Sequence, residues 1–273
     1  MVQLSEILLA SDFTARSDRP LDRALQLAAQ WRAHLAIVHV LEKDEGDIGD
    51  DMIARLRSEL PESGSDAELI IERGSVPKIL ARVAEERQSA LLVTGIARYN
   101  SLGDYVLGTA VDHIVRNASA PVLVVKHRAG RAYRRLLVAT DLSDSSRAAL
   151  LKALQLFPDA DVILLHVYHV PFEGLLKSDD VQTHVRSEAQ RELETFLAHP
   201  DIAPEYRGRF EAVIAEGEIG GVVAQTLRER QIDLLVVGTN GHSGFFHSAI
   251  GSQAEHLLET ADCDVLAVRG VKR

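Results

Sequence analysis

The sequence repeats itself, and this internal repeat limits the folds open to the chain more than any other feature. The segment ILLASDFTARSDRPLDRALQL near the start aligns with LLVATDLSDSSRAALLKALQL, which places Asp12 on Asp141 at an offset of 129. Further along, ERGSVPKILARVAEERQSALLVTG aligns with AEGEIGGVVAQTLRERQIDLLVVG and places Gly95 on Gly238 at an offset of 143. We therefore predict two similar domains, 1–128 and 133–273, joined through the short polar segment HRAGRAYR.

Strand and helix patterns alternate within each copy. Apolar runs rich in Leu and β-branched residues, without regular polar alternation, predict strands that are buried on both faces. Residues such as Leu21, Ala24 and Ala28 recur between these runs at helical spacing. The alternation predicts an α/β fold in which each domain is a parallel, doubly wound sheet with helices on both faces. The predicted strands are 7–10, 35–40, 68–72, 91–95 and 122–126 in the first copy, and 136–140, 162–167, 210–215, 234–238 and 265–269 in the second.

Composition excludes several classes of protein. A formal net charge of −10 argues against a general nucleic-acid surface, which needs a basic face to release counterions. Cys263 is the single cysteine, so an intrachain disulfide and a cysteine-cluster metal site are both excluded. No stretch approaches the roughly 20 apolar residues of a membrane span, and no signal peptide is visible. We expect a cytoplasmic protein without a nucleic-acid or membrane partner.

The segment GTNGHSGFFHSAIGS is the most informative of the chain for function, because it follows a predicted strand and leads into a helical pattern. Gly238 and Gly241 permit close backbone approach to a ligand. Gly251 and Ser252 open a helix whose first amides are unpaired and attract anions. These properties suit a polyphosphate. A plain strand–loop–helix junction with glycine turns is the alternative, because glycine spacing alone is a weak signal.

The segment resembles the nucleotide-binding loop of the universal stress protein family, whose pattern is G-x2-G-x9-G-[ST]. The resemblance extends over the whole chain and implies the tandem-domain branch of that family. It implies two Rossmann-like domains with strand order 3-2-1-4-5 and ATP as the bound ligand. Carried over to this sequence, Asp141 would contact the ribose and the Val167 backbone the adenine. The residues near the sugar and the phosphates would be Gly238, Gly241, Gly251 and Ser252.

The first copy departs from this pattern. Its segment GIARYNSLGDYVLGT has Arg98 where the second glycine belongs, which either blocks the phosphates or contacts them as a charged donor. A degenerate site with weakened nucleotide binding is the favoured interpretation, and an adenosine-only pocket stays open as an alternative. The equivalents of the second-copy site residues are Asp12, Val40, Gly95, Gly108 and Thr109.

The intact loop contains no Lys or Arg between Gly241 and Gly251. Backbone amides would therefore carry most of the phosphate binding, and a Mg²⁺ ion bridging phosphate oxygens would help. His39 and His166 precede a valine at equivalent strand ends, and we expect hydrogen-bonded structural histidines there rather than metal ligands or catalytic groups. We predict no protein metal site and no catalytic residue.

Three functions remain open. No residue of either copy is placed as a general base, so a nucleotide-binding stress-response protein that acts through conformation or partner binding is favoured over an enzyme. A slow ATPase or nucleotide-transferring enzyme that uses the same pocket is the second hypothesis. A non-nucleotide interaction module is the third.

The last strand of each copy would expose an apolar sheet edge if it were left alone. We expect the segments Val122–Val125 and Val265–Val268 to pair antiparallel within one chain, an arrangement that the family resemblance also implies. Pairing of two chains into a homodimer stays an open expectation.

Overall fold

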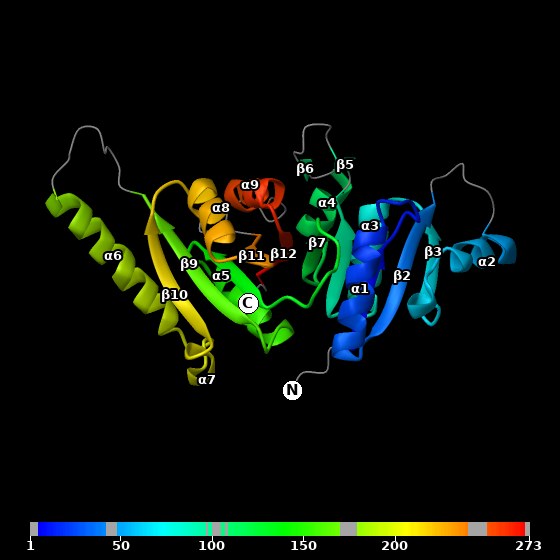
Figure 1. The fold of residues 1–273 in the computed structure, drawn as a ribbon, viewed down its shortest axis with the longest axis horizontal. Helices are drawn as coiled ribbons and strands as arrows, with labels where there is room; N and C mark the ends of the chain where they lie inside the picture. Colours follow the sequence, from blue (N-terminus) through cyan, green and yellow to red (C-terminus); the bar gives the residue numbers. More distant parts are fainter. Residues whose placement is uncertain are drawn as a thin grey trace. The chain divides into compact units, whose positions relative to one another are not determined.

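A computed structural model describes residues 5–41, 48–96, 98–99, 105–106, 109–169, 179–239 and 250–270. The chain divides into two compact units, which correspond to the two copies of the repeat (Figure 1). The first is Met1–Ala132 together with Asp264–Leu266, and the second is Tyr133–Cys263 together with Ala267–Arg273.

The first domain alternates strands with helices from its first element. Its elements are β1 (Glu6–Ala10), α1 (Asp18–Trp31), β2 (His34–Leu41), α2 (Asp50–Ser58), a 3-10 turn (Glu62–Gly64), β3 (Glu68–Arg73), α3 (Val76–Glu86), β4 (Leu91–Gly95), β5 (Arg98–Tyr99), β6 (Tyr105–Val106), α4 (Thr109–Asn117) and β7 (Val122–Val125). The sheet has the order β3-β2-β1-β4-β7, and each neighbouring pair is parallel. At its centre, Leu8 of β1 lies opposite Ala36 of β2 and Leu92 of β4.

The second domain repeats this plan with a longer helix after its second strand. Its elements are β8 (Arg135–Thr140), α5 (Asp144–Leu156), β9 (Asp161–Tyr168), α6 (Asp179–Leu197), α7 (Pro204–Arg207), β10 (Phe210–Glu216), α8 (Ile219–Glu229), β11 (Leu234–Gly238), α9 (Ser252–Thr260) and β12 (Asp264–Val268). The strands follow the order β10-β9-β8-β11-β12. Counted along each domain, both sheets have the predicted order 3-2-1-4-5.

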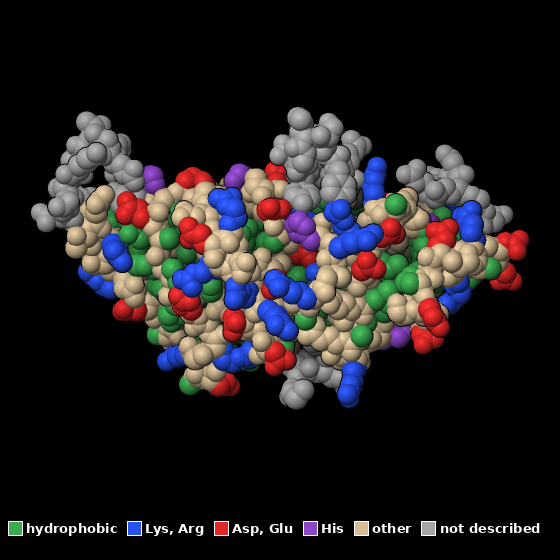
Figure 2. All heavy atoms as spheres, in the orientation of Figure 1, with side chains coloured by type: hydrophobic (Ala, Val, Ile, Leu, Met, Phe, Trp, Pro, Cys, Tyr) green, Lys and Arg blue, Asp and Glu red, His purple; other side chains and the backbone are tan. Residues whose placement is uncertain are grey.

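Apolar central strands explain why both sheets lie between helices. The side chains of Leu8, Leu92 and Val93 in the first domain are fully buried, as are those of Leu137 and Leu235 in the second. Helix α1 packs against β1 and β4, whereas α3 and α4 pack against each other and against β2 and β7. Figure 2 shows acidic and basic side chains interspersed on the face in view. Among the described residues, no helix combines the length and the apolar character that a membrane crossing requires.

All ten predicted strands are confirmed. The short ribbon of β5 and β6 was not predicted, because two-residue strands carry no periodic signal. The repeat is also preserved in backbone conformation. Gly74 and Gly217 end equivalent segments with φ of +144° and +143°, a region that side-chain-bearing residues rarely adopt.

Candidate functional site

A cavity of about 390 Å³ lies at the carboxyl ends of β8 and β11 in the second domain. The chain order of the sheet reverses between these two adjacent strands, which makes this edge the topological switch point where ligands of such folds bind. The cavity gathers residues that are far apart in the sequence. Four of the predicted site residues line it, namely Asp141, Gly238, Gly251 and Ser252.

Asp141 directly follows β8, and the start of α5 fixes its carboxylate. Its Oδ1 accepts hydrogen bonds from the backbone N of Ser143 at 3.1 Å and from the Ser143 Oγ at 2.5 Å. Ser143 is the N-cap of α5, and its Oγ also accepts a bond of 3.2 Å from the backbone N of Ser146. Asp141 is therefore an exposed carboxylate held in a defined orientation at the cavity wall, where it can accept a hydrogen bond from a ligand hydroxyl.

Gly238 is required by packing rather than by a turn. A Cβ atom at this position would lie 2.8 Å from the Ser145 carbonyl carbon and 2.8 Å from the Ser146 backbone N. The absence of a side chain at Gly238 therefore allows the end of β11 to approach the first turn of α5 closely. This is a different reason for glycine from the one that the sequence suggested, which was a tight turn and close approach to a ligand.

The helix that the motif predicted is present. Gly251 is the N-cap of α9, which begins at Ser252. The Gly251 backbone N donates a 2.9 Å bond to the Thr239 carbonyl oxygen, which ties the helix start to the end of β11. The amides of the following turn therefore face the cavity edge with the positive end of the helix. Gly241 lies outside the described residues.

The lining includes apolar side chains that the sequence did not single out. Ile219, the first residue of α8, and Leu257 of α9 form part of the wall. Ile219 follows the third strand of the domain, a position that the sequence analysis did not consider. Its equivalent at the offset of 143 is Val76, which lines the corresponding cavity of the first domain. The internal repeat therefore relates the two lining positions. Val167 of β9 is not among the lining residues.

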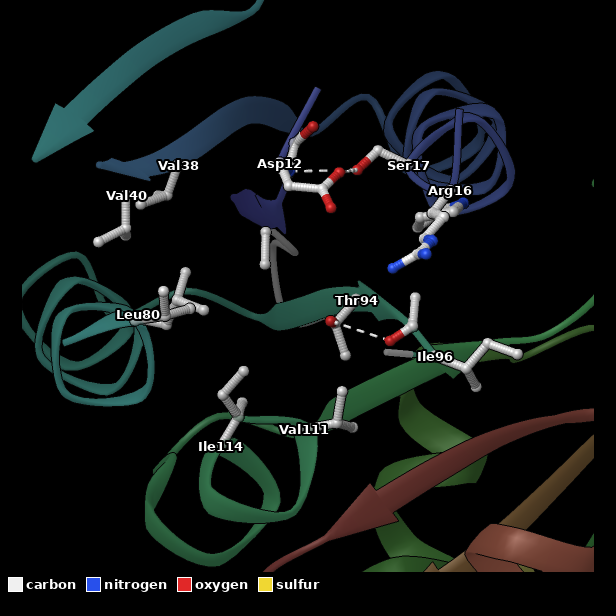
Figure 3. Close-up of a pocket in the computed structure, with 15 residues that line it drawn as sticks. Asp12, Arg16, Ser17, Val38, Val40, Leu80, Thr94, Ile96, Val111 and Ile114 are labelled. Atoms are coloured by element: carbon white, nitrogen blue, oxygen red, sulfur yellow. Dashed lines mark hydrogen bonds between the residues drawn. The ribbon is translucent and has the colours of Figure 1, made fainter. Parts of the chain in front are cut away.

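The first domain has a smaller cavity of about 170 Å³ at the equivalent place (Figure 3). Asp12, Val40 and Gly95 line it. The Asp12 Oδ1 accepts bonds from the Thr14 backbone N at 3.0 Å and from the Thr14 Oγ1 at 2.8 Å, which matches the bonds from Ser143 to Asp141. It also accepts a bond of 2.7 Å from the Ser17 Oγ. Gly108 lies outside the described residues, and Thr109 is the first residue of α4.

The segment after β4 differs between prediction and structure. Arg98 lies in β5, where it pairs antiparallel with Val106 of β6, and Tyr99 pairs with Tyr105. The backbone at Arg98 is thus part of a short ribbon rather than an open loop. Whether the Arg98 side chain excludes or contacts phosphates stays a prediction.

The equivalent histidines are hydrogen-bonded, as predicted. The Nδ1 of His39 lies 2.9 Å from the Ser11 carbonyl oxygen, and the Nδ1 of His166 lies 3.1 Å from the Thr140 carbonyl oxygen. Each ring therefore binds the chain at the end of the first strand of its domain. Cys263 is buried.

A sequence model of the universal stress protein family matches the chain twice, over residues 4–126 and again over 132–269. The chain belongs to the universal stress protein family. Two matches in succession make it a tandem-domain member.

Curated relatives match about half of this chain. Universal stress protein A homolog 1 of Coxiella burnetii is 31% identical over 144 residues, which are 50% of this chain and 96% of that protein. Universal stress protein A of Escherichia coli is 30% identical over 147 residues, 50% of this chain and 94% of that protein. One copy of the repeat thus corresponds to nearly all of each relative.

Solved structures also match this chain over nearly its whole length. A functionally unknown protein of Pseudomonas aeruginosa aligns with a TM-score of 0.70 and 19% identity, over 98% of this chain and 93% of that chain. A universal stress protein of Archaeoglobus fulgidus aligns with a TM-score of 0.69 and 16% identity, over 98% of this chain and all of that chain. At these identities the likeness concerns the fold alone.

Proposed function

We propose that this universal stress protein binds ATP in its second domain and acts through nucleotide-dependent conformation or partner binding. The single observation that supports it best is the cavity at the switch point, because it combines an oriented Asp141 carboxylate with the start of α9. A carboxylate suits a ribose hydroxyl, and a helix start suits a phosphate. The volume of 390 Å³ lies in the usual range for small-molecule sites.

The expected contacts with the nucleotide follow from the family's glycine motif. Asp141 would hold the ribose, the Val167 backbone the adenine, and Gly238 would lie near the sugar. Gly241, Gly251 and Ser252 would bind the phosphates. A Mg²⁺ ion would arrive bound to the phosphates, since the described residues contain no group of three or more His, Cys, Asp or Glu that could hold a metal. The same proposal places the protein in the cytoplasm.

Titration of the intact chain with ATP and Mg²⁺ tests this function. We expect one strong site per chain, because only the second copy carries the complete glycine motif. Two sites of equal affinity would contradict the proposal. Steady turnover of ATP that a pocket substitution abolishes would favour the slow ATPase instead, and absence of any nucleotide binding would favour the interaction module.

We also propose that the two domains of one chain pair through their last strands, β7 and β12. Each of these strands ends the strand order of its own sheet. An apolar edge of this kind is unstable in water unless it is covered. Pairing of two chains into a homodimer is compatible with this arrangement.

A further inference from the structure

The two cavities differ in the residue that stands beside the end of the fourth strand of each domain. In the second domain this residue is Ser145, whose backbone and Oγ lie close to Gly238. At the offset of 129, the first domain has Arg16. Arg16 lines the first-domain cavity together with Thr94 and Gly95 at the end of β4. The guanidinium group points into this cavity in Figure 3.

The opposite walls of the first cavity are apolar. Val40 comes from β2, Leu80 from α3, and Val111 and Ile114 from α4. Leu80, Val111 and Ile114 are buried, so they present a dry surface on which the flat face of a base can pack. The cavity therefore combines an apolar wall with one carboxylate, Asp12, and one guanidinium.

Arg16 lies next to a hydrogen-bonded turn that contains Asp12. It directly precedes Ser17, the N-cap of α1, and the Ser17 Oγ donates a hydrogen bond of 2.7 Å to the Asp12 Oδ1. Burial raises the pKa of Asp12, but hydrogen bonds from Ser17 and Thr14 and the nearby Arg16 charge outweigh it and hold the pKa below its usual value. Asp12 is thus anionic at neutral pH, and the positive charge of Arg16 lies on the side of β4.

The segment after β4 offers fewer backbone donors than an open loop would. Pairing of Arg98 with Val106 and of Tyr99 with Tyr105 uses backbone groups of this segment within the ribbon. A long polyphosphate needs several amides along its length, whereas one phosphate can be held by one guanidinium.

We propose that the first-domain cavity binds an adenine nucleoside monophosphate, with Asp12 on the ribose and Arg16 on the single phosphate, and that it disfavours the triphosphate. The choice of adenine rests on the proposed function of the second domain. The phosphate preference rests on Arg16 and the ribbon of the first domain. The two domains of one chain would then sense nucleotides of different charge.

Calorimetric titration of the full chain with AMP, ATP and adenosine tests this inference. All variants carry Asp141→Ala and Gly241→Arg, which remove the ribose and phosphate contacts proposed for the second site, so that the remaining binding reports on the first domain. We expect AMP to bind this background more tightly than ATP does. Addition of Arg16→Ser, the residue type of the second domain, should weaken AMP binding by about tenfold, because a charge-assisted contact is lost. Adenosine affinity should change less than twofold.

Two further variants serve as controls. Arg16→Lys keeps the charge and should retain most of the AMP affinity. Arg19→Ser removes a neighbouring arginine whose Nη1 donates to the Lys126 carbonyl oxygen at 2.7 Å and which does not line the cavity. It should leave AMP affinity unchanged, with circular dichroism as the folding check.

The inference is overturned if the background with both second-domain substitutions binds no AMP, if it prefers ATP, or if Arg16→Ser lowers AMP and adenosine affinity equally. Strong ATP binding by the wild-type chain combined with any of these results would overturn the first-domain inference and leave the proposed function intact. Failure of the wild-type chain to bind ATP would instead contradict the proposed function itself.

Discussion

Gly238 and Gly95 occupy equivalent positions, but their surroundings tolerate a methyl group to different degrees. A Cβ at Gly238 would lie 2.8 Å from backbone atoms of Ser145 and Ser146, which cannot rotate away. At Gly95 the nearest atom would be the Pro20 Cγ at 3.3 Å, a tight contact that a small shift relieves. The glycine is therefore more strictly required in the second domain than in the first.

This contrast predicts unequal costs for the same substitution. Gly238→Ala should lower the free energy of unfolding by about 2 kcal/mol, as overpacking in a close contact typically does. Gly95→Ala should cost less than about 1 kcal/mol. Urea unfolding, monitored by hydrogen exchange in each domain, measures the free energy of unfolding of both variants. Equal losses in the two variants would mean that the approach of β11 to α5 does not set the requirement.

At the amino ends of the first sheet, a charged cluster joins β1, β3 and the residue after α3. The Arg87 Nη2 donates to a carboxylate oxygen of Glu6 at 2.7 Å and to one of Glu68 at 2.6 Å. Burial raises the pKa of Glu6, but its hydrogen bonds from Arg87 and Ser89 and the Arg87 charge outweigh it and lower the pKa below its usual value. The second domain has Arg135 at the position of Glu6, and of this cluster it keeps the ion pair of Arg230 with Glu211, 3.4 Å apart.

The lowered pKa of Glu6 predicts how the first domain responds to acid. The carboxylate stabilises the folded state fully above the ordinary glutamate pKa of about 4.3, and this stabilisation is lost as the pH falls through the lower folded value. Glu6→Gln should cost about 2 kcal/mol of unfolding free energy at pH 7 and flatten its dependence on pH below about 4.3. Fluorescence of Trp31, the single tryptophan, reports this unfolding. The exposed Glu62→Gln is the control, and an equal effect of both variants would contradict the role of the cluster.

In the whole molecule, we propose that the two copies of the repeat are joined through their last strands. The proposed pairing through β7 and β12 predicts slow amide exchange in both strands of the intact chain. The separate pieces 1–128 and 133–273 should exchange faster at these strands, because each edge then faces water. Hydrogen-exchange mass spectrometry measures this difference. Unchanged exchange in the separate pieces would contradict the pairing.

Much of this architecture could be predicted from the sequence, because buried parallel strands and internal repeats carry strong signals. The strand order follows from the family resemblance, and the meeting of Asp141 with Gly251 follows from the sheet topology. Two features of the first domain could not be predicted from the sequence. The ribbon at Arg98 is too short for a periodic pattern, and no local pattern indicates that Arg16 lines the cavity. The reason for glycine at Gly238 also needs the close contact between β11 and α5, which no local pattern encodes.

The central claim is that the glycine motif of the second domain holds the phosphates of ATP, and Gly241→Arg tests it most directly. The substitution gives the second copy the residue that the first copy has at Arg98. Loss of close phosphate approach removes contacts worth roughly 1.5–3 kcal/mol each. Calorimetry should therefore show ATP binding weakened by at least about a hundredfold, or ~2.7 kcal/mol. Adenosine affinity should fall much less, with circular dichroism unchanged. If ATP affinity is unaffected, or falls no more than adenosine affinity does, the motif does not bind phosphates and the account is wrong.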